Sequence, residues 1–191
     1  ALITLGYSMV YSILKYMNFA HGDVYTLGTM LTGFMLVEGG INPIIAIPAG
    51  ILLGSVAAIG VERIAYRPLR GEDGTVTMIA AFAMGLIIRN ITEYLWEPRT
   101  RTFPSLLGTK IITVSGLRIT AAHLGVLVTA VAVIVIFNIF LRYTKHGKAI
   151  IFVSQDMTTS SLMGIPVNKT ITTIYAIGGI LGVIGGIMFG S

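Results

Sequence analysis

Long, continuous apolar runs constrain this chain more than any other feature of its sequence. Six of them are present, at residues 1–14, 24–37, 43–61, 76–96, 124–141 and 171–189. Several reach the roughly 20 residues that a helix needs to cross a bilayer, and their continuity excludes the alternating pattern of a membrane β-barrel. The sequence therefore predicts an all-α polytopic membrane protein. We expect about five or six transmembrane segments, of which the second is short or broken.

Composition and charge agree with a membrane location. Only 11% of the residues are charged, against roughly a quarter in a soluble domain. The net charge of +5 is interpreted as a topology signal and not as a nucleic-acid-binding surface. If the loop after residue 61 is cytoplasmic, eight basic residues lie inside, namely Lys15, Arg63, Arg67, Arg70, Arg142, Lys145, Lys148 and Lys169. Four lie outside, namely Arg99, Arg101, Lys110 and Arg118, and this split favours that orientation.

The chain is expected to form one transmembrane domain over residues 1–191. It begins without methionine and stops directly after an apolar run, so we treat it as a fragment, truncated at both ends. The outer loop KIITVSGLRIT contains two β-prone stretches around Ser115–Gly116, a pattern typical of a hairpin. A small periplasmic hairpin and an irregular loop are both open interpretations.

Polar residues between the first two runs stand out in the stretch NFAHGD. Asn18, His21, Gly22 and Asp23 interrupt apolar sequence where one helix ends and the next begins. We expect either a structural elbow or part of a translocation path, because irregular backbone at membrane depth is tolerated inside protein or beside water. Gly22 would permit a tight backbone approach, and Gly22→Val is then expected to abolish transport. His21 lacks a second histidine nearby, which argues against a metal site.

Arg89 and Glu93 lie within the fourth run, four residues apart on one helical face. Charges inside a membrane are costly and usually pair or face water. The spacing permits an ion pair. A structural pair or an interfacial anchor is favoured over contact with a solute.

Small residues recur every four positions in the last run, at Gly178, Gly182, Gly186 and Gly190. Such stripes let helix backbones approach closely in lipid. Close helix packing is the favoured interpretation, and a glycine face along a solute path is the alternative.

The inner loop between residues 142 and 169 is predicted to contain two short helices. Ser154 and Asp156 offer side-chain oxygens to free backbone N–H groups at a break. Gly164 is expected to end the second helix. The pair could dock a soluble partner or rest on the membrane surface.

Three segments together resemble the permease subunits of branched-chain amino acid ABC transporters, and most nearly the Liv H-type subunit. They are NFAHGD at residues 18–23, ERIAYRPLRG at 62–71 and GKAIIFVSQDMTTSSLMGIPVNK at 147–169. The resemblance implies an importer with two permease subunits, two cytoplasmic ATPase subunits and a periplasmic binding protein. It also implies that the inner loop is the ATPase-coupling loop, with Gly147, Asp156, Gly164 and Ile165 matching the family pattern.

These observations predict a permease subunit that moves leucine, isoleucine and valine across the inner membrane of a bacterium or archaeon. No phosphate-binding G-x-x-x-x-G-K-[ST] motif is present in the sequence, so we expect no cofactor on this chain, with ATP used by the partner ATPase. Permeases for urea or short amides remain open, as does an ion-coupled secondary transporter that uses His21, Arg89 and Glu93. An intramembrane enzyme is the weakest alternative, because no catalytic set is recognised.

Overall fold

The computed structural model describes residues 1–15, 17–96, 103, 111–114 and 117–190. It contains the helices α1 (Leu2–Leu14), α2 (His21–Val37), α3 (Pro43–Val61), α4 (Gly74–Trp96), α5 (Ala121–Tyr143), α6 (Lys145–Gln155), α7 (Met157–Leu162) and α8 (Val167–Gly190). The predicted apolar runs correspond to α1 to α5 and α8, which confirms the all-α polytopic membrane fold.

Four helical segments are long and apolar enough to cross a membrane, within the described part of the chain. They are Pro43–Tyr66, Gly74–Trp96, Ala122–Tyr143 and Val167–Gly190. The first joins α3 to a π-helical turn, η1 (Glu62–Tyr66). α1 and α2 are shorter, with 13 and 17 residues. The length of α2 agrees with the expectation that the second segment is short or broken.

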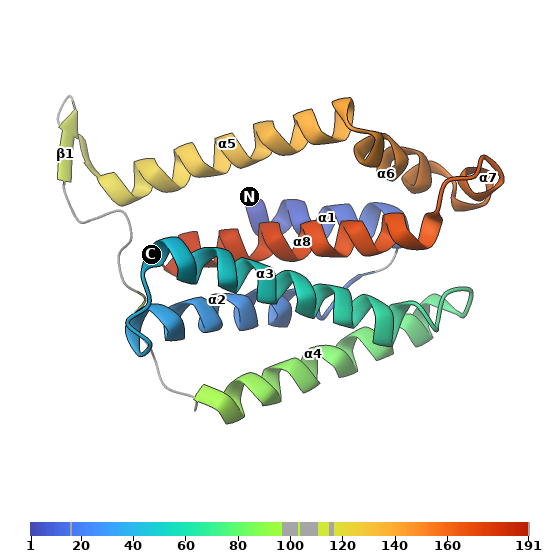
Figure 1. Ribbon diagram of the computed structural model, residues 1–191, viewed down its shortest axis with the longest axis horizontal. Coiled ribbons are helices and arrows are strands. Elements are labelled where there is room, and N and C mark those ends of the chain that lie inside the picture. The colour runs from blue at the N-terminus through green and yellow to red at the C-terminus, as the bar shows by residue number, and fades with distance from the viewer. Residues whose placement is uncertain (16, 97–102, 104–110, 115–116, 191) are drawn as a thin grey trace.

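Helix α8 is the centre of the bundle and packs against α1, α2 and α3 (Figure 1). The predicted glycine stripe of α8 faces these neighbours. A Cβ atom at Gly178 would lie 3.4 Å from the Gly6 carbonyl oxygen of α1, and one at Gly182 would lie 3.0 Å from Cβ of Tyr25 in α2. On the next face of α8, a Cβ atom at Gly179 would lie 2.8 Å from Cβ of Ala58 in α3. The missing side chains let these backbones approach closely, which supplies dispersion contacts that lipid cannot.

Helix α5 lies apart from this bundle along its length (Figure 1). None of the most apolar 18-residue stretch of α5 is buried, and its main contacts are to α6 and β2. β1 (Ile111–Val114) pairs with β2 (Leu117–Thr120) in antiparallel register, Ile111 opposite Thr120. The predicted turn at residues 115–116 lies outside the described residues, and the position of a hairpin over the outer mouth stays a prediction.

Basic residues gather at one end of the bundle, which we call the basic end. It is formed by the end of α1, η1 and the turn after it, the end of α5, the helices α6 and α7, and the beginning of α8 (Figure 1). Arg70 donates to Asn168 there, which ties the turn after η1 to the first turn of α8. All eight basic residues predicted to lie inside belong to these elements.

Candidate functional site

The break between α1 and α2 lies beside the middle of a membrane-spanning helix. α1 ends with Lys15 in the left-handed conformation, and α2 begins at His21. A Cβ atom on Gly85 would lie 3.4 Å from Cα of Ala20 and 2.6 Å from Oδ2 of Asp23. Gly85 is the twelfth of the 23 residues of α4, which spans about 34 Å at 1.5 Å per residue. The first turn of α2 therefore lies near mid-depth, where broken helices of transporters hold their solute sites.

The close backbone approach at this break is made by Gly85 and not by Gly22. A Cβ atom on Gly22 would meet no described atom within 4 Å, and Gly22 lies in the first turn of α2 without positive φ. The expectation that Gly22 permits a close backbone approach is therefore wrong for the described residues. At Gly85 the same atom would collide with the carboxylate of Asp23.

Arg89 pairs with Asp23 across two helices. Its Nε donates to Oδ1 of Asp23 at 3.1 Å, and Glu93 makes no ion pair with it among the described residues. This corrects the predicted pairing within α4. An arginine that precedes its acid by four residues has the less favourable order for a helical pair, whereas Gly85 lets Asp23 reach the same face of α4 from α2.

A groove between α1 and α2 lies on the other side of this turn. It has a volume of about 350 Å³ and is lined by Ile3, Thr4, Tyr7, Asn18, Phe19, His21, Gly22 and Tyr25. His21 is buried, and its Nε2 has no hydrogen-bond partner among the described residues. Its ring lies between those of Tyr7 and Tyr25, with centroids 6.1 and 6.3 Å away. Three of the four predicted residues of the break, Asn18, His21 and Gly22, thus line one open groove.

A buried ionic network lies at the basic end. The side chain of Glu62, in η1, is 0% exposed and pairs with Arg70. Thr172 of α8 donates to the second carboxylate oxygen of Glu62 at 2.9 Å. Arg70 also donates to Asn168. Buried charges persist when paired and hydrogen-bonded in this way, so the network fixes the first turns of α8 against the end of α3.

The end of α3 that carries this network also contacts the α1–α2 break. The hydroxyl of Tyr66 donates to Oδ1 of Asn18 at 3.1 Å in a buried contact. The rings of Tyr66 and Tyr175 pack with centroids 5.3 Å apart. A π-helical turn adds a residue to a helix and often occurs at functional sites. Here η1 presents Glu62 and Tyr66 to α8 and to the break.

The predicted helix–break–helix pattern of the inner loop is present as α6 and α7. Asp156 caps α7, because its carboxylate accepts from the N–H groups of Thr158 and Thr159 at 2.8 and 3.1 Å. A hydrogen bond from the Thr159 hydroxyl, followed by these two backbone bonds, lowers the pKa of the Asp156 carboxyl. Gly164 follows α7 with φ of +80°, which glycine adopts without strain. Ser154 donates to the Ile151 carbonyl and is not a cap.

This loop has one face on the bundle and one open face. Ile150 and Val153 of α6 are buried in the core, whereas Phe152 is half exposed. Leu162 is 84% exposed and Met163 is 69% exposed. Gly147 lies where α6 turns against α5, since a Cβ atom there would collide with backbone of Leu141. Ile165 packs against the core, so the loop is anchored at both ends and leaves an apolar tip exposed.

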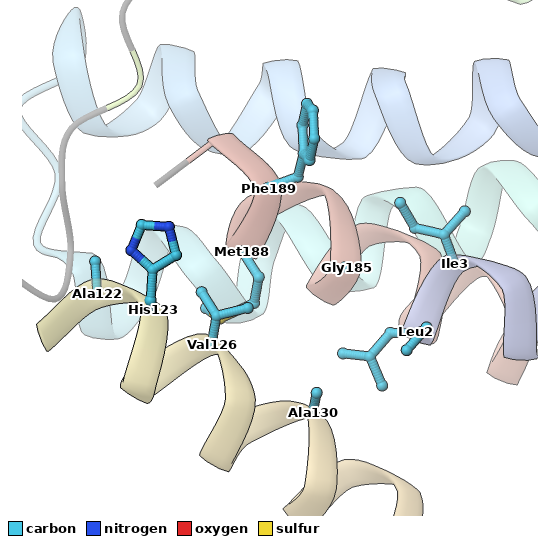
Figure 2. Close-up of a pocket in the computed structure, with 10 residues that line it drawn as sticks. Leu2, Ile3, Ala122, His123, Val126, Ala130, Gly185, Met188 and Phe189 are labelled. Carbon is cyan, nitrogen blue, oxygen red and sulfur yellow. The ribbon is translucent and has the colours of Figure 1, made fainter. Parts of the chain in front are cut away.

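Two further cavities lie away from the basic end. A cleft of about 550 Å³ lies between α5 on one side and the beginning of α1 and the end of α8 on the other. Figure 2 shows the residues that line it. Its lining is apolar apart from His123. A second cavity of about 370 Å³ lies between α2 and α4, where Met30, Phe34, Trp96 and Phe103 line it.

Sequence reasoning missed the ionic network, although its residues carry a detectable signal. Glu62 directly follows an apolar run of 19 residues, and a carboxylate in that position needs a partner. The partners Arg70 and Asn168 lie 8 and 98 residues from the groups they bind. Helical periodicity does not predict contacts between residues at these separations.

Comparisons with known proteins agree across the whole chain. A family model described as the permease component of branched-chain amino acid transport systems matches residues 1–191. Among curated relatives, the permease LivH of Salmonella typhimurium and the permease BraD of Pseudomonas aeruginosa are each 29% identical over 202 residues. Both are described as high-affinity branched-chain amino acid transport system permease proteins, and the match covers all of this chain and 66% of each relative.

A more distant relative is the probable LivH permease of Methanocaldococcus jannaschii, 25% identical over 98% of this chain and 61% of the relative. The chain thus spans a little less than two thirds of the length of these proteins. No solved structure matches it.

Proposed function

Because the chain belongs to the family of permease components of branched-chain amino acid transport systems, we propose that it serves an ATP-driven importer of leucine, isoleucine and valine. The match of the family model to residues 1–191 carries this proposal. The importer would lie in the inner membrane of a bacterium or archaeon. The chain itself would bind no cofactor and hydrolyse no ATP.

Separate surfaces of this chain would serve the proposed partners. The exposed apolar tip formed by Leu162 and Met163 at the basic end suits a cytoplasmic ATPase subunit. A second permease subunit would face the open groove and the charged face beside the first turn of α2 across the solute path, since charged side chains do not suit lipid. A periplasmic binding protein would deliver the solute at the opposite end.

The geometry suggests how ATPase movement reaches the solute path. Movement of α7 would pull on the first turn of α8 at Asn168, which Arg70 ties to Glu62. η1 carries this movement to Asn18 through the hydroxyl of Tyr66. Alternating access would then come from displacement of the α1–α2 break relative to α8.

Reconstitution tests the proposal. The full-length transporter, expressed with its neighbouring genes, is placed in liposomes, and uptake of labelled leucine is measured with and without ATP and binding protein. Uptake that requires both is expected. Uptake driven by an ion gradient without ATP would show an ion-coupled transporter instead. Uptake of urea or a short amide, without leucine, would retain the importer architecture and change its substrate.

A further inference from the structure

We propose that the Asp23–Arg89 pair is a binding site for the zwitterionic head of an α-amino acid. The guanidinium of Arg89 would bind the α-carboxylate, and the carboxylate of Asp23 would bind the α-ammonium. This inference rests on the proposed function, and it assigns the contact that recognises the solute within the membrane.

The exposure of Arg89 is the first argument. Arg89 is the sixteenth of the 23 residues of α4, seven residues or about 10 Å before Trp96. Its side chain is nevertheless 58% exposed. A guanidinium in this position is costly to leave among lipid tails. Its face therefore borders water, headgroups that the long side chain reaches, or another protein surface such as the wall of a solute path.

Unused hydrogen-bonding capacity is the second argument. A guanidinium has five N–H donors, and among the described residues Arg89 uses only the one on Nε, toward Asp23. The terminal nitrogens remain for a carboxylate, which guanidinium groups bind in a bidentate manner.

Gly85 leaves room for the carboxylate. Oδ2 of Asp23 lies 2.6 Å from the position that the Cβ atom of any other residue at position 85 would take. The Asp23 side chain is 15% exposed, and its Oδ1 accepts from Nε of Arg89. The pair is therefore a fixed dipole with no net charge. A neutral zwitterion, aligned against it, places each of its charges beside the opposite one.

A cavity lies along the same two helices, lined by apolar and aromatic residues together with Thr29 and Glu38. Met30 and Trp96 line the cavity between α2 and α4, and each lies seven residues, about two helical turns, beyond Asp23 and Arg89 respectively. The rings of Phe34 and Trp96 pack edge to face there, 6.0 Å apart. A cavity of about 370 Å³ suits a small ligand. An aliphatic amino acid approaching from this end would meet aromatic surface first and the charged pair next.

Equilibrium binding to the complete transporter tests the site. The transporter is placed in lipid nanodiscs without binding protein, and labelled leucine is competed with two analogues. Leucinamide replaces the carboxylate by a neutral amide, and 2-hydroxy-4-methylpentanoate replaces the ammonium by a hydroxyl. Each analogue should bind about 10- to 100-fold more weakly than leucine, the loss expected for a hydrogen bond between charged groups.

Each variant should change the selectivity of the transporter for one charged group of leucine. Arg89→Gln is expected to remove the preference for leucine over leucinamide, and Asp23→Asn the preference over the hydroxy acid. Gly85→Ala displaces the Asp23 carboxylate without changing its charge and should act as Asp23→Asn does. Glu93→Gln, exposed one turn farther along α4, is the matched control and should preserve both preferences.

The outcomes separate this inference from the proposed function. Equal weakening of leucine and both analogues in the Asp23 and Arg89 variants would assign the pair a structural role and overturn the inference. An absence of saturable leucine binding to the wild-type transporter would overturn it as well. ATP-dependent leucine uptake by the wild-type transporter, measured in liposomes, reports on the proposed function independently of either result.

Discussion

Replacing Arg70 by methionine is expected to destabilise the bundle strongly, because it leaves Glu62 charged and buried. The Glu62 side chain is 0% exposed and its two carboxylate oxygens bind Arg70 and Thr172. Methionine replaces the aliphatic part of the arginine side chain and carries no charge. Among the described residues, the hydroxyl of Thr172 then remains as the hydrogen-bond donor to the carboxylate.

The magnitude follows from the burial of the two partners. Removal of one member of a buried ion pair costs about 3–5 kcal/mol. The Arg70 side chain is 19% exposed, which weakens the pair through solvent screening and places the expected loss near 3 kcal/mol. Glu62→Gln should cost less, because Arg70 can extend toward water at the basic end. The double variant Glu62→Gln with Arg70→Met should recover most of the loss.

Unfolding in mixed micelles titrated with a denaturing detergent measures these differences. The chain has one tryptophan, and Trp96 is buried beside Phe34, so its fluorescence reports on packing between α2 and α4. An Arg70→Met variant as stable as the wild type would refute the reasoning. So would a double variant less stable than Arg70→Met.

Three further predictions concern packing, the helix cap and the cytoplasmic surface. Gly179→Ala should lower the free energy of unfolding by about 1–3 kcal/mol, because its Cβ atom would lie 2.8 Å from Cβ of Ala58, while Gly60→Ala, with open space around it, should not; equal stabilities would contradict this. Since hydrogen bonds lower the pKa of Asp156, its contribution to α7 is present at neutral pH and is lost as the pH falls below about 4 and through the lowered pKa. The protection of α7 from hydrogen exchange, measured relative to the intrinsic exchange rate at each pH, should therefore fall in acid for the wild type but not for Asp156→Asn, whose amide still accepts from the backbone; identical pH profiles of protection would rule this out. Leu162→Asp should reduce retention of the ATPase subunits during purification about tenfold or more without changing Trp96 fluorescence, and full retention would argue against docking at α7.

Local features were predictable where a short stretch of sequence contains all the groups involved. The helices follow the apolar runs, because each backbone polar group in lipid must bond within its own segment. Asp156 and the N–H groups that it accepts from are two and three residues apart. Gly164 ends α7 for the same local reason, its freedom at positive φ.

Pairings between helices were not predictable in this way. The spacing of Arg89 and Glu93 permits an ion pair, but Asp23 is the observed partner, from 66 residues away. Hydropathy does not distinguish one face of a membrane helix from another, so it gave no reason to prefer α2 as the source of that partner. The close approach at Gly85, and not at Gly22, depended on the same contact.

The sequence by itself determined that this chain is a helical membrane protein of the branched-chain amino acid permease family, because apolar length and local motifs depend on neighbouring residues alone. Tertiary structure alone decided which polar groups meet inside the bundle. Asp23 meets Arg89, Glu62 meets Arg70 and Thr172, and Asn18 meets Tyr66. Each of these contacts requires two segments to approach within about 3 Å. That approach depends on how two helices cross and on which glycines meet at the crossing, and the sequence of one segment specifies neither.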